Sequence, residues 1–191
     1  MNPRPNEYAY FLPIVMPLVQ PCPKYLVMDA IRHAAVDFFT RTRVWRERHV
    51  GALTEGANDI PLPPASSLVR VEYVGVNGQR LILGIDYVVR DATVDVKFPK
   101  GVEGPCCTEL CVSLCPSRDA EALPDEQARD WGDAVVYGAL AKIKAMSGNS
   151  VGWIDAEGAK VHFDLYESEI ARAQRLVTRD RAGWNILTVA S

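Results

Sequence analysis

Residues 21–45 read PCPKYLVMDAIRHAAVDFFTRTRVW. Pro23 stands where the first turn of a helix tolerates proline. After it, apolar residues recur at the three- and four-residue spacing of an amphipathic helix: Leu26, Val27, Ala30, Ile31, Ala34, Ala35 and Phe38. The pattern predicts a helix over residues 23–43.

Two further helical segments follow much later in the sequence. Leu123-Pro124-Asp125-Glu126 places a proline and two acids where a helix begins, which predicts a helix over residues 124–147. The second segment, residues 155–181, repeats apolar residues at spacings of four and three: Ala159, Phe163, Tyr166, Ile170, Ala173 and Val177. We expect an antiparallel helix hairpin with this seam buried. Gly138 in mid-helix indicates close approach of another backbone, since glycine there costs up to about 1 kcal/mol.

Residues 44–116 contain the short alternating segments typical of β-strands. Asn77-Gly78 best tolerates the positive φ angles of a type I′ turn and predicts a hairpin between residues 68–76 and 79–83. A second hairpin is predicted from residues 87–89 and 94–98, with further strands over residues 44–53 and 107–114. Residues 59–64 contain three prolines and predict an extended connector.

Together these segments predict an α+β fold. An N-terminal helix and a C-terminal antiparallel helix hairpin would form a bundle, with a small antiparallel β subdomain inserted over residues 44–116. The domain would span residues 21–182. Residues 1–20 are expected to be an extended N-terminal arm that lies on a neighbour or on the body of the fold, because an apolar arm requires a surface to cover. Gly183 is expected to end the last helix and to begin a C-terminal tail over residues 183–191.

The composition sets limits on the class of protein. With 191 residues, 48% hydrophobic and 24% charged, the chain is long enough to bury one substantial core. A net charge of −3 disfavours a protein whose main work is to grip nucleic-acid phosphates. No segment reaches the roughly 20 apolar residues that a membrane span requires. The apolar N-terminal run does not have the pattern of a signal peptide.

Five cysteines, an odd number, disfavour a complete disulfide framework and favour a reducing compartment. Four of them cluster at Cys106, Cys107, Cys111 and Cys115. Residues four apart on a strand lie about 13 Å apart, too far for two thiolates to ligate one zinc ion at about 2.3 Å each. We therefore expect free thiols and no metal.

Other residues with catalytic potential form no catalytic pattern. His33, His49 and His162 fall on three different predicted elements, and the aspartates near residues 86–95 fall at hairpin ends, where they serve backbone hydrogen bonds. The sequence therefore predicts neither an enzyme nor a bound cofactor. The alternative is a small cytosolic enzyme or ligand-binding module that uses the Cys106–Cys115 region with one of the histidines.

A run of arginines has two interpretations: Arg41, Arg43, Arg46 and Arg48. They form either a solvated face balanced by Glu47 and Glu55, or a ring of positive charge where subunits meet or DNA passes. Charges repeated by symmetry sum into a strong local field. Arg172, Arg175, Arg179 and Arg181 carry the same ambiguity.

A series of packing and turn motifs follows in a characteristic order: Pro21-Cys22-Pro23, Ala30-Ile31, Ala34-Ala35, Phe38-Phe39, Thr42, Trp45, the proline-rich connector, the Val71 to Asn77-Gly78 hairpin, Leu123-Pro124, Gly138-Ala139-Leu140-Ala141, and Phe163 with Tyr166. In order and spacing this series, over roughly residues 21 to 180, resembles the head-to-tail adaptor proteins of tailed bacteriophages. The chain departs from the family at Gly152-Trp153, where a proline often stands next to the tryptophan.

The resemblance implies a structural virion protein. Adaptors of this family form a ring, usually of twelve copies, beneath the portal at the capsid vertex. The ring continues the DNA channel and gives the tail its docking surface. The implied partners are other copies of the chain, the portal protein, a tail or nozzle protein and the passing DNA, with no membrane. The implied location is the virion neck, assembled in the host cytoplasm.

The C-terminal end carries the predicted portal-docking residues. The tail is too short to build its own core yet contains Trp184, Ile186, Leu187 and Val189. Related adaptors commonly dock through their C-terminal ends, which favours an extended docking peptide with Trp184 as its anchor. The other interpretation, in which these side chains fold back onto the protein's own helices, stays open.

Overall fold

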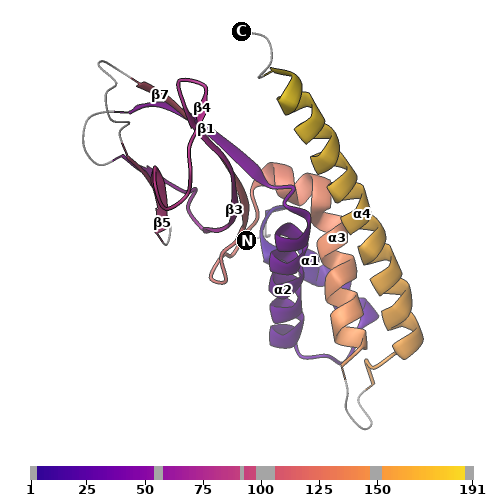
Figure 1. Cartoon of the computed structure of the whole chain (residues 1–191). Coiled ribbons are helices and arrows are strands. Elements are labelled where there is room, and N and C mark those ends of the chain that lie inside the picture. Colours follow the sequence, from indigo (N-terminus) through magenta and orange to yellow (C-terminus); the bar gives the residue numbers. More distant parts are fainter. Residues whose placement is uncertain (1–3, 54–57, 91–92, 98–105, 147–151, 188–191) are drawn as a thin grey trace.

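A computed structural model describes residues 4–53, 58–90, 93–97, 106–146 and 152–187, with the backbone alone for residues 180–187. Within these ranges the chain forms a helical part and a β part that extend away from each other (Figure 1). Most buried apolar side chains of both parts belong to one continuous core. None of the described helices is long and apolar enough to cross a membrane.

The helical part has four α-helices within the described residues. These are α1 (Tyr8–Val15), α2 (Lys24–Thr42), α3 (Asp125–Lys144) and α4 (Ala156–Leu187), with a short 3₁₀ helix at Met16–Leu18 after α1. Helix α3 packs against α2 on one side and against α4 on the other, and α4 also contacts α2. The predicted antiparallel hairpin of α3 and α4 is confirmed (Figure 1).

The β part contains two antiparallel sheets. Its described strands are β1 (Arg46–Leu53), β2 (Asp59–Pro61), β3 (Ser66–Val76), β4 (Gln79–Arg80), β5 (Tyr87–Arg90), β6 (Thr93–Val96) and β7 (Cys106–Pro116). The first sheet has the order β1-β7-β3-β4 and the second the order β2-β6-β5. Both predicted hairpins form, but the strand expected over residues 79–83 is only Gln79–Arg80, and residue 98 of the second hairpin lies outside the described residues. In the first, Asn77 and Gly78 have φ angles of 48° and 80°, and Gly75 pairs with Arg80.

The prediction of a small β subdomain inserted into a helical bundle is wrong. Strands β3 and β7 are each 11 residues long, and β7 is a central strand between β1 and β3. Residues 110–115 of β7 are all buried, so this strand is covered on both faces. The proline-rich connector also contributes: Asp59–Pro61 pairs with β6 as an edge strand, a position where proline removes no required hydrogen bond. The β part is thus a substantial two-sheet unit.

The expected extended arm over residues 1–20 is also corrected, because residues 8–15 form α1. Its buried residues are Tyr8, Phe11, Leu12 and Val15, the spacing of one helix face, and α1 packs on α2 and α3. Pro13 lies inside this helix. A proline costs about 3 kcal/mol there, whereas each large apolar side chain that becomes buried contributes about 1.5–3 kcal/mol. Four such side chains outweigh the one proline.

The last helix differs from its prediction in two respects. Its backbone remains helical through Gly183 to Leu187, so Gly183 does not end the helix, and the boundary expected at residues 182–183 is wrong. Five of the six seam residues are buried, but Phe163 is 50% exposed. The seam packs where Tyr166 meets Gly138 of α3: a Cβ at Gly138 would lie 2.9 Å from the Tyr166 ring and 3.0 Å from the Ala34 Cβ. A close neighbour at Gly138 was expected, but the nearest atoms belong to the side chains of Tyr166 and Ala34 and not to another backbone.

Candidate functional site

Helix α4 is much longer than the helix it packs against. It has 32 residues and α3 has 20. Their register is seen at Arg172, whose guanidinium donates to the Asp130 carbonyl at 3.1 Å and stacks 4.3 Å from the centre of the Trp131 ring. The first residue of α3, Asp125, lies five residues before Asp130. Because α4 runs antiparallel to α3, the residue of α4 at the same level is Val177, five residues after Arg172.

The end of α4 therefore runs past the start of α3. Residues 178–187 extend beyond it by about 15 Å at 1.5 Å per residue. Figure 1 shows this yellow end of α4 continuing beyond α3. We call residues 178–187 the α4 overhang.

The predicted portal-docking residues lie mostly on this overhang. Trp184, Ile186 and Leu187 belong to its helical backbone, and Val189 lies outside the described residues. The expectation of an extended peptide is wrong for residues 183–187, because they are helical. Whether they bind a portal stays a prediction.

The four arginines predicted for a ring interface or DNA channel face different neighbours. Arg41, in the last turn of α2, forms a two-pronged ion pair with Glu167 of α4 at 2.7 and 2.9 Å. Arg43 is the helix C-cap, with a φ of 55°. Arg48 pairs with Glu109 of β7 at 2.9 Å. Arg46 has a buried Nε and Nη2 with no hydrogen-bond partner within the described residues. The role assigned to these arginines stays a prediction, and ion pairs reduce the charge that Arg41 and Arg48 offer to a partner.

The cysteine cluster lies on β7 without the geometry of a reactive site. Cys106, Cys111 and Cys115 are buried, and Cys107 is exposed. Burial raises the pKa of the Cys111 and Cys115 thiols, which disfavours the nucleophilic thiolate. Among the residues that the structure describes, no three His, Cys, Asp or Glu side chains gather as a metal site would require. The alternative of an enzyme or ligand-binding module built on Cys106–Cys115 stays a prediction.

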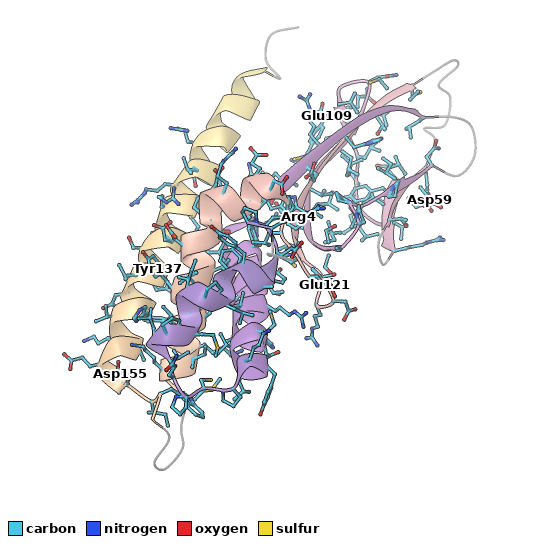
Figure 2. All side chains as sticks on the ribbon, turned by 180° about the vertical axis from the view of Figure 1, so that it is seen from behind. Arg4, Asp59, Glu109, Glu121, Tyr137 and Asp155 are labelled. Carbon is cyan, nitrogen blue, oxygen red and sulfur yellow. The ribbon has the colours of Figure 1, made fainter. Side chains whose placement is uncertain are left out.

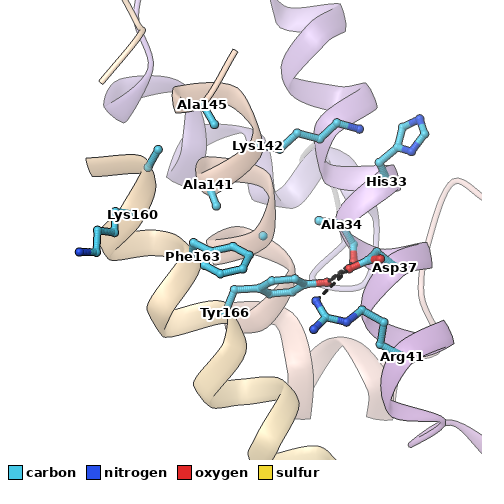
Figure 3. A pocket seen from close by; sticks show the side chains of 12 residues that line it. His33, Ala34, Asp37, Arg41, Ala141, Lys142, Ala145, Lys160, Phe163 and Tyr166 are labelled. Carbon is cyan, nitrogen blue, oxygen red and sulfur yellow. Dashed lines mark hydrogen bonds and ion pairs between the residues drawn. The ribbon is translucent and has the colours of Figure 1, made fainter. Parts of the chain in front are cut away.

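A groove of about 570 Å³ opens between α2, α3 and α4 (Figure 3). Small and aromatic side chains line most of it: Ala34, Gly138, Ala141, Ala145, Ala159, Phe163 and Tyr166. Charged or titratable side chains stand around these: His33, Asp37, Arg41, Lys142 and Lys160. An apolar concavity with a few polar groups is the usual form of a binding site.

One wall of the groove is held by a polar network. The Tyr166 hydroxyl donates to Asp37 at 2.8 Å and lies 3.3 Å from the Ala34 carbonyl. Burial, and then the hydrogen bond to Asp37, raise the pKa of Tyr166 above its ordinary range. The hydrogen bond to Glu167 raises the pKa of Arg41. Tyr166 therefore stays protonated and acts as a fixed part of the wall rather than as a base.

A second exposed apolar feature lies in the β part, on the turn between β4 and β5. Ile82, Leu83 and Ile85 are 58%, 61% and 64% exposed. The turn is tightly held, since Asp86 accepts a hydrogen bond from the Ile82 amide at 2.8 Å and Lys97 donates to the Ile85 carbonyl at 2.8 Å. We call residues 81–86 the apolar loop.

Neither the groove nor the apolar loop was predicted from the sequence. The loop had a detectable signal, because the run Leu81-Ile82-Leu83-Gly84-Ile85 is too apolar for an ordinary solvated turn. The groove had no local signal, since its lining comes from three helices that lie far apart in the sequence.

Comparison with protein-family models and with curated proteins found no match.

Proposed function

We propose that this chain is a structural virion protein of the head-to-tail adaptor type, which assembles as a ring of about twelve copies between the portal and the tail of a bacteriophage. The observation that carries the proposal is the α4 overhang. A helix end about 15 Å beyond its packing partner, with Trp184, Ile186 and Leu187 in its sequence, has the composition of a docking element. Aromatic residues are enriched among the anchors of protein interfaces.

The distribution of exposed apolar residues supports a ring. A ring requires two different surfaces on each subunit, because each copy contacts one neighbour through one surface and the next neighbour through another. The chain carries the apolar loop in its β part and, on α4, Phe163, which is 50% exposed and lines the groove, whereas Val161 and Leu165, 53% and 42% exposed, lie on another side of the helix. Two separate apolar surfaces suit a heterologous contact better than a two-fold dimer, which needs one.

Removal of the overhang tip tests the proposal. A variant lacking residues 184–191 is mixed with the portal protein, and co-sedimentation measures the bound fraction. We expect an unchanged melting temperature, because residues 184–187 lie beyond the start of α3, together with loss of portal binding. The matched control is Val50→Ser, which changes a 55% exposed side chain on β1 and is expected to bind the portal normally. Normal binding by the truncated chain would refute a docking role for this end.

A further inference from the structure

We propose that the apolar loop of one copy docks in the α2–α3–α4 groove of the next copy, and that this contact joins neighbouring subunits. The inference rests on the proposed function as a ring-forming protein and identifies the surfaces through which the ring would close.

The apolar loop is preorganised for docking. Three large aliphatic side chains, Ile82, Leu83 and Ile85, are each more than half exposed. Backbone hydrogen bonds hold the loop in one shape: the Asp86 amide donates to the Ile82 carbonyl at 2.9 Å, and the Gly84 amide donates to the Tyr87 carbonyl at 2.8 Å. Gly84 has a φ of 82°, which favours glycine at this position. A loop already fixed in its shape loses little conformational freedom on binding.

The groove has the size and lining that such a loop requires. Its 570 Å³ falls within the range of sites that enclose most of a small ligand's surface. Its exposed apolar ring, Phe163, stands half in solvent beside small alanine side chains, so an aliphatic group can approach closely. Burial of apolar surface from both sides is the main favourable contribution to such a contact.

Charged side chains on the two surfaces favour one orientation of the contact. Lys142 and Lys160 both line the groove, and neither forms an ion pair with another described residue. Asp86, at the end of the apolar loop, uses one carboxylate oxygen, Oδ2, for the Ile82 amide. Its second oxygen can accept a hydrogen bond from one of these lysines, which would fix the orientation of the loop.

The two surfaces cannot meet within one chain. The groove lies near the start of α4, and the apolar loop belongs to the β part. Figure 2 places Asp155, which precedes α4, and Asp59 of β2 at opposite ends of the molecule. Each copy therefore offers its loop to one neighbour and its groove to another, which produces a closed ring or an open filament.

Cysteine cross-linking tests the contact. The starting chain carries Cys107→Ser, since Cys107 is the exposed cysteine among those described. Leu83→Cys and Ala145→Cys are prepared as two separate full-length variants, mixed at high concentration and treated with a short bis-maleimide. We expect about tenfold more dimer in this mixture than in either variant alone, because the bound state holds the two thiols at high effective concentration. The double variant is expected to give a ladder of higher oligomers.

A matched mixture controls for random collision. Val50→Cys replaces Leu83→Cys, since both positions are exposed apolar sites in the β part. Equal dimer yields in the two mixtures would overturn the proposal. A third mixture adds the Leu83→Glu variant as a competitor; Leu83 is exposed, so this variant is expected to fold normally. Unmodified protein should compete with the Leu83→Cys variant for the groove and lower the dimer yield, whereas the Leu83→Glu variant should not.

The outcomes separate this inference from the proposed function. A ring on the portal without the Leu83–Ala145 cross-link would refute the loop-in-groove contact and leave the ring function standing. The cross-link without any portal binding would support the contact and refute the proposed function. Protection of Ala145→Cys only when a tail protein is added would assign the groove to that partner instead.

Discussion

Ile170→Ala tests which face of α4 is buried. Ile170 is 3% exposed and lies on the seam between Tyr166 and Ala173. Truncation of a buried isoleucine to alanine removes apolar contacts and leaves a cavity, at a cost of about 2–5 kcal/mol. The neighbouring Ala173 is too small to fill the space. We therefore expect a loss of about 3 kcal/mol in the free energy of unfolding.

Thermal and urea denaturation followed by far-UV circular dichroism measure this loss. For a chain of this length each kcal/mol lowers the melting temperature by about 2–4 °C, so the expected shift is roughly 6–12 °C. Two variants on the same helix serve as controls. Phe163→Ala, at a half-exposed position, should cost about 1–2 kcal/mol, and Val161→Ala should cost less than about 0.5 kcal/mol. A Phe163→Ala variant less stable than Ile170→Ala would refute this placement of α4.

Three further predictions concern the groove wall, the start of α4 and the thiols. Tyr166→Phe removes the hydrogen bond to Asp37 and should cost about 1 kcal/mol in urea denaturation. The Gly158 amide and Lys144 hold the pKa of Asp155 below its ordinary value, so the unfolded chain binds the proton more tightly than the folded chain. The stability that Asp155 adds to the folded state is therefore complete above the ordinary carboxyl pKa and is lost as the pH falls through the folded pKa. Asp155→Asn should flatten the acid limb of the stability–pH curve. In a thiol-labelling time course, Cys107 should react first, and Cys111 and Cys115 only as fast as the chain unfolds.

Features set by neighbouring residues could be predicted from the sequence. The Asn77-Gly78 turn depends on the φ angles that these two residues tolerate, and both adopt positive values. Helix α2 follows the apolar spacing after Pro23, and its observed bounds differ from the predicted ones by one residue at each end. Close packing at Gly138 was predictable because glycine in mid-helix is unfavourable without a compensating close approach, but the neighbour is the Tyr166 ring and not the backbone that was expected.

Features set by tertiary packing could not be predicted in this way. Pro13 and Gly183 are both residues that disfavour helix, yet each lies inside one. At Pro13, burial of four apolar side chains outweighs the lost hydrogen bond. The exposure of Phe163 depends on where α2 and α3 leave a groove, which the spacing of apolar residues along α4 does not specify. The same holds for the groove itself.

Cryo-electron microscopy of the purified protein mixed with its portal protein tests the central proposal most directly. We expect a closed ring of about twelve copies on the portal, with the α4 overhang of each copy against a portal subunit and each apolar loop in the groove of its neighbour. Portal particles that carry no ring, although the protein is present in large excess over the portal, would contradict the proposed function.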